Sequence, residues 1–322
     1  MLKILQKLIF PLLAFVLGGF LYWLVLCPKA PVKRVCNEKY FFLSREIDCE
    51  NIDEKANQIE NLHSGIQQIV DEEKSEKHII RASIFYRDLN SRRWFGVNDI
   101  DKFYPASLIK LPIAIMYYKI AELEPGVFDK ELKIPENEGD NSDQYYPPAE
   151  SLVAGKSYPI KELIRHMLEY SDNAPFSTLA DAGKVFREKV LSDLNIYEPL
   201  AGEGEGAWSI NARSYANIFR MLHNASYVNV QSANEILNTL SRSTFTSGIV
   251  AGVPENVVVA HKFGEAAGME SDGDVKSLIL NDCGIVYKKD NPYILCIMTE
   301  GTDYSVLEKT IQRISETIYN KL

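Results

Sequence analysis

The sequence contains little of what a metal site or a nucleic-acid-binding surface requires. Its five cysteines form no C-x-x-C pair and its five histidines are scattered along 322 residues, so we expect no metal and no cofactor. Acidic residues outnumber basic ones by 44 to 35, the formal net charge is -9, and no basic stripe stands out. A chain of this charge repels a phosphate backbone, which excludes nucleic acid as a partner. Internal repeats and low-complexity tracts are absent as well.

Charged residues are also missing from Leu8 to Cys27. As a helix, this apolar run would span ~30 Å, about the hydrocarbon thickness of a bilayer. Tyr22 and Trp23 lie near its end, as is typical of a membrane interface. We therefore expect a single-pass transmembrane anchor over residues 1–27. A cleavable signal peptide is the alternative, but no A-x-A-like site follows the run. Lysines flank the run on both sides, so charge does not set its direction.

Residues 28–55 are rich in charge and poor in periodicity, which indicates a juxtamembrane stalk. Cys36 and Cys49 lie within it, either as a disulfide or as two free thiols. Apolar spacing over residues 56–322 predicts one α/β (α+β) domain. Its expected helices cover 55–73, 107–123, 160–170, 174–192, 210–224 and 304–321, and its expected strands cover 79–86, 93–97, 257–263, 277–287 and 292–299. Strands at both ends predict an antiparallel sheet built from the two chain ends, with flanking helices and an inserted helical lobe.

Three short motifs carry candidate chemistry. Ser107 and Lys110 are three residues apart at the start of a predicted helix, so the amine can reach the hydroxyl, and the helix N-terminus favours an alkoxide. Alone, this spacing is also that of a helix cap followed by a solvated lysine. Ser171-Asp172-Asn173 lies between two predicted helices, where its side chains either project into a cleft or simply cap a helix.

The third motif is Lys262-Phe263-Gly264-Glu265 at the end of a predicted strand. A lysine on an edge strand commonly protects against aggregation. Here Gly264 would let a substrate lie close along the strand, and the charge of Lys262 would favour a neutral Lys110 that acts as a general base.

The order of these motifs and their flanking segments resemble the class A β-lactamase family and its penicillin-binding relatives. The resemblance covers roughly residues 60–322 and is carried by DKFYPASLIK, LEYSDN, HKFGE and the terminal hairpin NDCGIVYKKDNPYILCIMTEG. It implies the fold of that family, with the active site between the sheet and the helical lobe. The hairpin carries no catalytic residue, so its match supports the resemblance independently.

The resemblance also implies the roles of the motif residues. Ser107 would be the acylated nucleophile, Lys110 its first proton acceptor, and Ser171 the residue that passes a proton to the leaving nitrogen. Asn173 would hold a substrate amide, and Lys262 would bind the substrate carboxylate. The backbone N–H groups of Ser107 and Glu265 would form the oxyanion hole, with Gly264 beside them.

Two departures from the family pattern affect what we expect of the substrate and of turnover. Phe263 stands where the family has Thr or Ser, so one hydroxyl contact to a substrate carboxylate is lost. The segment LNIYEPLAGEGEGAW is shorter than the loop that carries the family's deacylating Glu. Glu198 echoes the family's Glu-Pro, but Glu203 and Glu205 compete with it as the deacylation base. Without a base, hydrolysis of the acyl-enzyme slows by ~10²–10⁴-fold.

The expected function is therefore that of an active-site-serine hydrolase that opens a β-lactam or a related amide. The alternatives are a D-Ala-D-Ala-type peptidase acting on peptidoglycan peptides with slow deacylation, and a non-hydrolytic β-lactam-binding sensor. We expect a monomeric catalytic domain outside the cell membrane. His166 is predicted to lie on a helix surface and His261 to orient Lys262, while Cys283 and Cys296 are predicted to be packed thiols.

Overall fold

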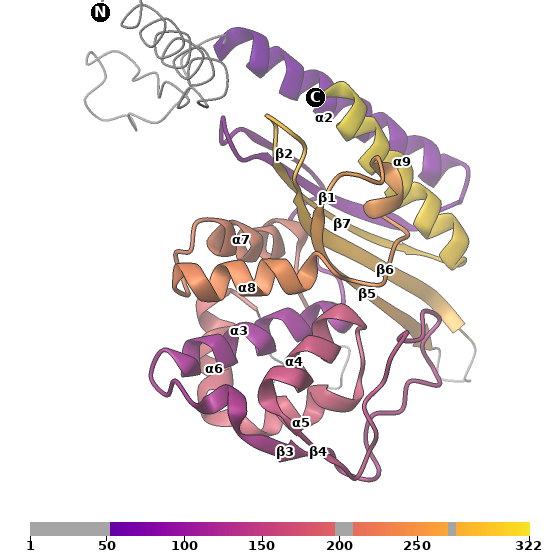
Figure 1. Ribbon diagram of the computed structural model, residues 1–322. Coiled ribbons are helices and arrows are strands. Elements are labelled where there is room, and N and C mark those ends of the chain that lie inside the picture. The colour runs from indigo at the N-terminus through magenta and orange to yellow at the C-terminus, as the bar shows by residue number, and fades with distance from the viewer. Residues whose placement is uncertain (1–51, 197–208, 270–274) are drawn as a thin grey trace, which may run out of the picture. The chain divides into compact units, whose positions relative to one another are not determined.

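The computed structural model describes residues 52–196, 209–269 and 275–322, and all of these except Ile52 belong to one compact unit, Asp53–Leu322 (Figure 1). The predicted anchor and stalk, and the candidate bases Glu198, Glu203 and Glu205, lie outside the described residues. Among the residues that are described, no helix is long and apolar enough to cross a membrane.

A five-stranded antiparallel sheet joins the two ends of this unit, as the sequence predicts. The strand order is β2-β1-β7-β6-β5. The strands are β1 (Arg81–Asp88), β2 (Trp94–Val97), β5 (Val259–Met269), β6 (Val275–Val286) and β7 (Tyr293–Gly301). Strand β1, from the start of the unit, pairs along its length with β7 from the end, in a register that places Arg81 opposite Glu300. This order leaves β5 at one edge of the sheet.

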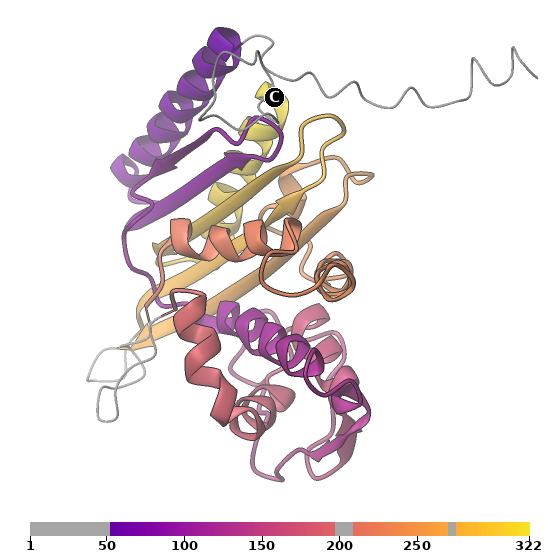
Figure 2. The same ribbon diagram turned by 90° about the vertical axis from the view of Figure 1, so that its left-hand side faces the viewer.

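Alternating side chains divide the sheet between two hydrophobic cores. Ile84 and Tyr86 belong to the core beneath α2 (Ile52–Ser75) and α9 (Tyr304–Lys321), whereas Phe85 between them belongs to the core of the helical lobe. This is the period of two expected for a strand buried on both faces. Helices α2 and α9 lie on one face, and α7 (Ala212–His223) and α8 (Val230–Leu240) lie on the other (Figures 1 and 2).

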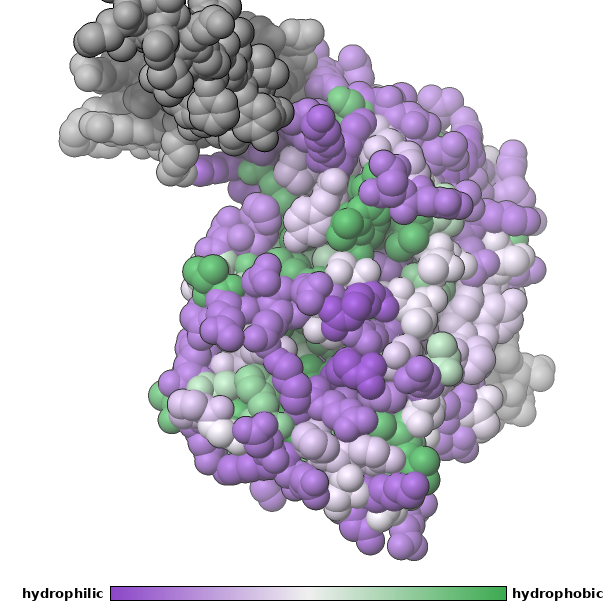
Figure 3. Space-filling model, in the orientation of Figure 1, coloured by the Kyte–Doolittle hydropathy of each residue, from purple (hydrophilic) through white to green (hydrophobic). Residues whose placement is uncertain are grey.

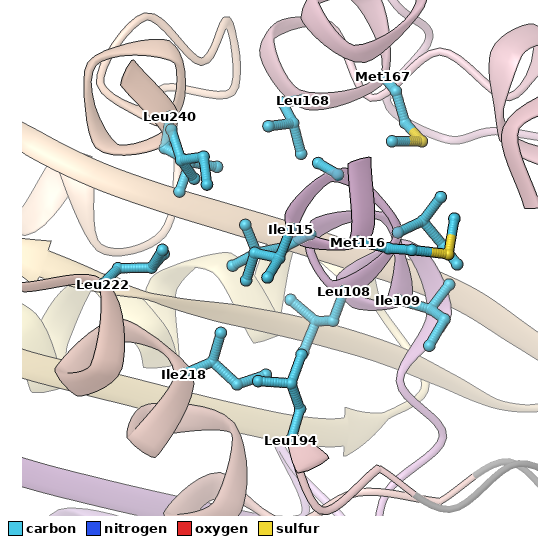
Figure 4. Packing of buried hydrophobic residues seen from close by; sticks show 14 of the residues in the cluster. Leu108, Ile109, Ile115, Met116, Met167, Leu168, Leu194, Ile218, Leu222 and Leu240 are labelled. Carbon is cyan, nitrogen blue, oxygen red and sulfur yellow. The ribbon is translucent and has the colours of Figure 1, made fainter. Parts of the chain in front are cut away.

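The helical lobe is built around α3 (Lys110–Ala121), which follows the 3₁₀ turn η1 (Ala106–Ile109). Its sequence, KLPIAIMYYKIA, is apolar on nearly every side, and ten of its twelve residues are buried. Leu108 and Ile115 meet Ile218, Leu222 and Leu240 from α7 and α8 (Figure 4). The remaining elements of the lobe are η2 (Val127–Asp129), β3 (Glu131–Lys133), β4 (Ser157–Pro159), α4 (Ile160–Glu169), α5 (Ala174–Ala182) and α6 (Lys184–Asp193). A further short turn, η4 (Val250–Gly252), packs on α9.

In the fold, the structure corrects three expectations and adds elements that the sequence did not predict. The helix predicted over 174–192 is two helices, because the chain breaks at Gly183, where a Cβ would lie 2.0 Å from the Met116 methyl group. Cys283 and Cys296 form a disulfide rather than packed thiols, since they lie directly opposite each other on β6 and β7. His166 is buried and not on the helix surface. Helix α8 and the small β3–β4 sheet were not predicted at all.

The molecular face shown in Figure 3 is mostly hydrophilic, with small hydrophobic patches separated by polar side chains. Individually exposed apolar residues of this kind are normal on a protein surface. The features that point to function lie instead in a cleft between the lobe and the edge of the sheet.

Candidate active site

Ser107 lies at the start of the helical lobe, beside the edge strand β5. Ala106 before it adopts a positive φ of 49°, and the Tyr215 hydroxyl donates a hydrogen bond of 2.8 Å to the carbonyl of Leu108 just after it. A left-handed φ at a non-glycine residue costs of order 1 kcal/mol and persists only where the surroundings fix the backbone. The turn therefore presents Ser107, half-buried, to a cleft of about 250 Å³.

The lining of this cleft draws on segments far apart in the chain. It comprises Tyr104, Ala106, Ser107, Ile109, Lys110, Gln144, Ser171, Asn173, Phe176, Phe263, Glu265 and Ala266. All three sequence motifs thus contribute side chains to a single cleft. Lys262, which lies just beneath the lining, joins them through hydrogen bonds.

Lys110 is buried at the bottom of the cleft. Its Nζ donates to the carbonyl of Ser171 at 2.5 Å and to Asn173 Oδ1 at 2.7 Å, and it lies 3.5 Å from Ser171 Oγ. Among the described residues it makes no hydrogen bond to Ser107. Burial lowers the pKa of Lys110 to about 7, although the carboxylates of Asp172 and Glu265 act in the opposite direction. A large fraction of this amine is therefore neutral near pH 7.

Lys262 approaches the same hydroxyl from the sheet. Its Nζ donates to Ser171 Oγ at 2.8 Å and to the carbonyl of Phe263 at 2.9 Å. Burial, and then the nearby charge of Lys110, lower the pKa of Lys262 well below its usual value. The Ser171 hydroxyl thus lies between two buried amines, in a position where it can accept a proton from one and donate a proton onward. We call Lys110, Ser171, Asn173 and Lys262 the cleft floor.

The segment around Ser171 is held in place by Asp172. Ser171 itself has a positive φ of 57°, and the Asp172 carboxylate accepts hydrogen bonds from the backbone of Leu152 (2.8 Å) and Ala174 (3.1 Å). Asn141 completes the connection: its Nδ2 donates to Asp172 at 2.8 Å and its Oδ1 accepts from the backbone N–H of Asn173 at 3.0 Å. Asp172 is therefore a buried residue that holds Ser171 and Asn173 in position.

Gly264 allows the edge strand to approach the nucleophile turn. A Cβ at this position would lie 2.8 Å from the carbonyl oxygen of Pro105 and 2.9 Å from the backbone nitrogens of Ser107 and Leu108. Any side chain would push β5 away from η1. This close approach brings the backbone of Glu265 near that of Ser107, the two residues expected to supply the oxyanion hole.

Phe263, the departure from the family pattern, is part of an aromatic wall. Its ring stacks on Phe245 with centroids 4.1 Å apart, and Tyr146 meets both rings edge-on at 5.0 and 5.9 Å. We call Tyr146, Phe245 and Phe263 the aromatic wall. Lys262 Nζ lies 4.5 Å from the centre of the Phe263 ring, so the wall borders the cleft floor directly.

The Glu265 side chain closes the cleft beside this wall. Its two oxygens accept hydrogen bonds from the backbone N–H groups of Tyr145 (3.1 Å) and Tyr146 (2.8 Å). The pKa of Glu265 is raised, because burial outweighs the opposing effect of these N–H groups and of the charges of Lys110 and Lys262. Because both oxygens act as acceptors, the bonding pattern is that of an ionised carboxylate.

His261 does not orient Lys262 as predicted. Its Nδ1 is 2.7 Å from Asp282 Oδ1, and the other oxygen of Asp282 accepts from the backbone N–H of Ile249 at 3.0 Å. This buried pair ties β5 and β6 to the segment before η4. The sequence interpretation also missed Asn141 and Gln144, which lie in an irregular segment between the first two motifs. No local signal marks them, because their partners are set only by the tertiary fold.

An antiparallel sheet with an inserted helical lobe, a serine at the start of a buried helix, and two buried amines sharing a second serine define an active-site serine hydrolase. The chain belongs to the β-lactamase enzyme family, whose model matches residues 61–322. Among curated proteins, no sequence matches this chain.

Solved structures share the fold at low sequence identity. PBP-A superposes with a TM-score of 0.66 and 18% identity, over 81% of this chain and 95% of that one. A β-lactamase from Chitinophaga pinensis gives 0.67 and 16%, over 81% and 98%. A class A β-lactamase from Mycobacterium abscessus gives 0.64 and 18%, over 80% and 98%.

Proposed function

We propose that this protein is a β-lactamase-like hydrolase that is acylated at Ser107 by a β-lactam or a related amide. One observation carries the proposal: Ser107 opens into the same cleft as Lys110 and Ser171, and the Ser171 hydroxyl accepts a hydrogen bond from Lys262. A neutral amine at the helix start activates the nucleophile, and a second amine with a hydroxyl between them completes a path for the proton.

In the proposed acylation, Ser107 Oγ attacks the amide carbonyl carbon and its proton passes to the neutral amine of Lys110. The C–N bond then breaks, and the leaving nitrogen takes a proton from the Ser171 hydroxyl. Ser171 is reprotonated from the buried amines on either side of it, at 3.5 Å and 2.8 Å, so the proton count balances. The negative charge on the carbonyl oxygen is stabilised by the backbone N–H groups of Ser107 and Glu265, where losing one donor typically costs about 3 kcal/mol.

In this scheme, Asn173 contacts both Lys110 and the substrate. Its Oδ1 accepts a hydrogen bond from Lys110 at 2.7 Å, while its Nδ2 donates to the carbonyl of Asp140 at 3.3 Å. We propose that a substrate amide oxygen accepts from this Nδ2 group, which would orient the scissile bond toward Ser107.

The fate of the acyl-enzyme separates the candidate functions. Fast hydrolysis makes the protein a β-lactamase, with Glu198, Glu203 or Glu205 as the candidate base. Slow hydrolysis makes it a penicillin-binding peptidase or a non-hydrolytic sensor. Among similar structures, a variant of PBP-A is described as an acyl-enzyme complex with penicillin G. Phe263 favours keeping this alternative, because the hydroxyl that normally helps to bind a β-lactam carboxylate is missing.

The test uses the full-length protein with a fluorescent penicillin and a chromogenic cephalosporin. We expect a covalent adduct, seen by gel fluorescence and intact mass, that disappears in Ser107→Ala. Rapid colour development with the cephalosporin identifies a β-lactamase, and a persistent adduct without colour identifies a penicillin-binding protein or sensor. Labelling that survives in Ser107→Ala would show that another residue is the nucleophile, and no labelling at all would refute acylation by β-lactams.

The location is proposed from the sequence alone. The uncharged run from Leu8 to Cys27 would anchor the protein in the cell membrane, with the catalytic domain outside and acting as a monomer. Protease digestion of intact spheroplasts checks this. The domain should be cut from the outside, and a protected domain would reverse the orientation.

A further inference from the structure

The cleft contains its own carboxylate. Glu265 lines it directly after Gly264, and the backbone N–H groups of Tyr145 and Tyr146 hold both carboxylate oxygens. This negative charge lies close enough to Lys110 and Lys262 to favour the protonated form of each amine. Glu265 therefore acts as an internal counter-ion to the two lysines.

The groups that would bind a substrate carboxylate are occupied or replaced. Lys262 is fully buried, and its amine donates to Ser171 and to a backbone carbonyl. Phe263, which lines the cleft, has no hydroxyl where the family has Thr or Ser. No arginine is found among the described residues that line the cleft, where Lys110 and Glu265 are the only charged side chains.

We propose that this cleft selects acylating substrates whose group beside Phe263 and Glu265 is neutral or cationic rather than a carboxylate. Phe263, the member of the aromatic wall that lines the cleft, offers apolar contact to a neutral group, and Glu265 offers an ion-pair partner to a cationic one. A substrate carboxylate would instead face the Glu265 carboxylate, while the amines of Lys110 and Lys262 are held by other partners, and this arrangement is repulsive in a partly buried cleft. The inference rests on the acylation of Ser107 proposed above and adds the chemical class of the substrate.

The experiment compares penicillin G with its methyl ester, in which a small neutral ester replaces the carboxylate. Second-order acylation rate constants are measured on the full-length protein by time-resolved intact mass, and the selectivity ratio is the ester value divided by the acid value. We expect a ratio above one in the wild type. Glu265→Gln should lower the ratio by about tenfold, because it removes the repulsion while keeping the side-chain shape.

Glu136→Gln is the matched control. It removes the same charge at a carboxylate that is 84% exposed and lies outside the cleft, and the ratio should stay unchanged. Phe263→Thr, which restores the family's hydroxyl, should also lower the ratio. Since Phe263 is buried in the aromatic wall and its replacement risks misfolding, Glu265→Gln alone is sufficient to decide the question.

The two proposals fail in distinguishable ways. Acylation of Ser107 with a wild-type ratio below one, or with a ratio that Glu265→Gln does not change, would overturn the substrate inference and leave acylation standing. An equal fall in the ratio in Glu136→Gln would overturn it too, since net charge would then be the cause. Absence of any adduct with either compound would overturn both proposals.

Discussion

The cleft floor and the aromatic wall are neighbours that are stabilised in different ways. On the floor, Lys110 and Lys262 are buried amines held by directed hydrogen bonds, and a lost partner leaves a buried polar group unsatisfied. In the wall, Phe245 and Phe263 are held by ring packing, which tolerates apolar replacement at a moderate cost. Under the proposed mechanism, the floor carries the reacting groups, and the wall would influence which substrates fit beside it.

Replacing Lys110 by Met should have the largest effect on the reaction. The change keeps the length of the side chain and removes the proposed base, so acylation should slow by roughly 10²–10⁴-fold. Intact mass with a fluorescent penicillin measures the rate. Lys119→Met, the same replacement on the same helix at a 41% exposed side chain, should change the rate less than about twofold. Equal losses in both variants would show that α3 had merely been disrupted.

The second-largest effect should be the dependence of acylation on pH, which reports on the titration of Lys110 in the cleft floor. Because burial lowers the pKa of Lys110 to about 7, its neutral form increases as pH rises through 7. Acylation should therefore be about 100-fold faster on the alkaline plateau than at pH 5, where only about 1% of the amine is neutral. A rate that is flat from pH 5 to 9, measured by stopped-flow fluorescence, would exclude Lys110 as the titrating base.

Ser171→Ala tests the role of the hydroxyl that lies between the amines of Lys110 and Lys262. It removes the oxygen that accepts from Lys262 at 2.8 Å, and with it the proposed proton donor to the leaving nitrogen. We expect acylation to fall by about 10²-fold, less than on loss of the base. Ser151→Ala is the control, because its hydroxyl accepts from Asn141 on the far side of the same network. An unchanged rate in Ser171→Ala would move the proton path elsewhere.

Phe245→Leu should separate the wall from the floor. Phe245 packs behind Phe263 and does not line the cleft, so its truncation weakens the stack without touching the reacting groups. We expect the free energy of unfolding to fall by about 1–2 kcal/mol and acylation to change less than about threefold. Urea denaturation and the penicillin assay measure the two effects. A loss of acylation as large as that of Ser171→Ala would mean that the wall and floor act as one unit.

Much of the fold could be predicted from the sequence because its signals are local. The short apolar run that ends at Ile84, Phe85 and Tyr86 marks a strand, and the apolar run after Lys110 marks a buried helix. The break at Gly183 was missed, and the close approach of Met116 to Gly183 from another helix is evident only in the folded chain. Helix α8 was missed although Asn229 caps it, with a side chain that accepts from the Ser232 N–H.

The candidate site, like the fold, was predicted in part from the sequence. The family resemblance of the three motifs predicted that Ser107, Ser171 and Lys262 would share a cleft, and the structure places them at one. It did not predict that Lys110 would be bonded to Ser171 and Asn173 rather than to Ser107, nor that His261 would pair with Asp282. Motif spacing also gave no indication that the Glu265 side chain would face the cleft with both oxygens held by backbone amides.

The sequence alone determined which chemical groups are present. Ser-x-x-Lys, Ser-Asp-Asn and Lys-Phe-Gly are short motifs, and they can be recognised from residues adjacent in the chain. The tertiary structure decided how those groups act on one another. Burial sets the pKa of Lys110, the approach of β5 to η1 requires Gly264, and strand register joins Cys283 to Cys296. Each of these depends on atoms that are distant along the chain, and only the folded backbone brings such atoms into contact.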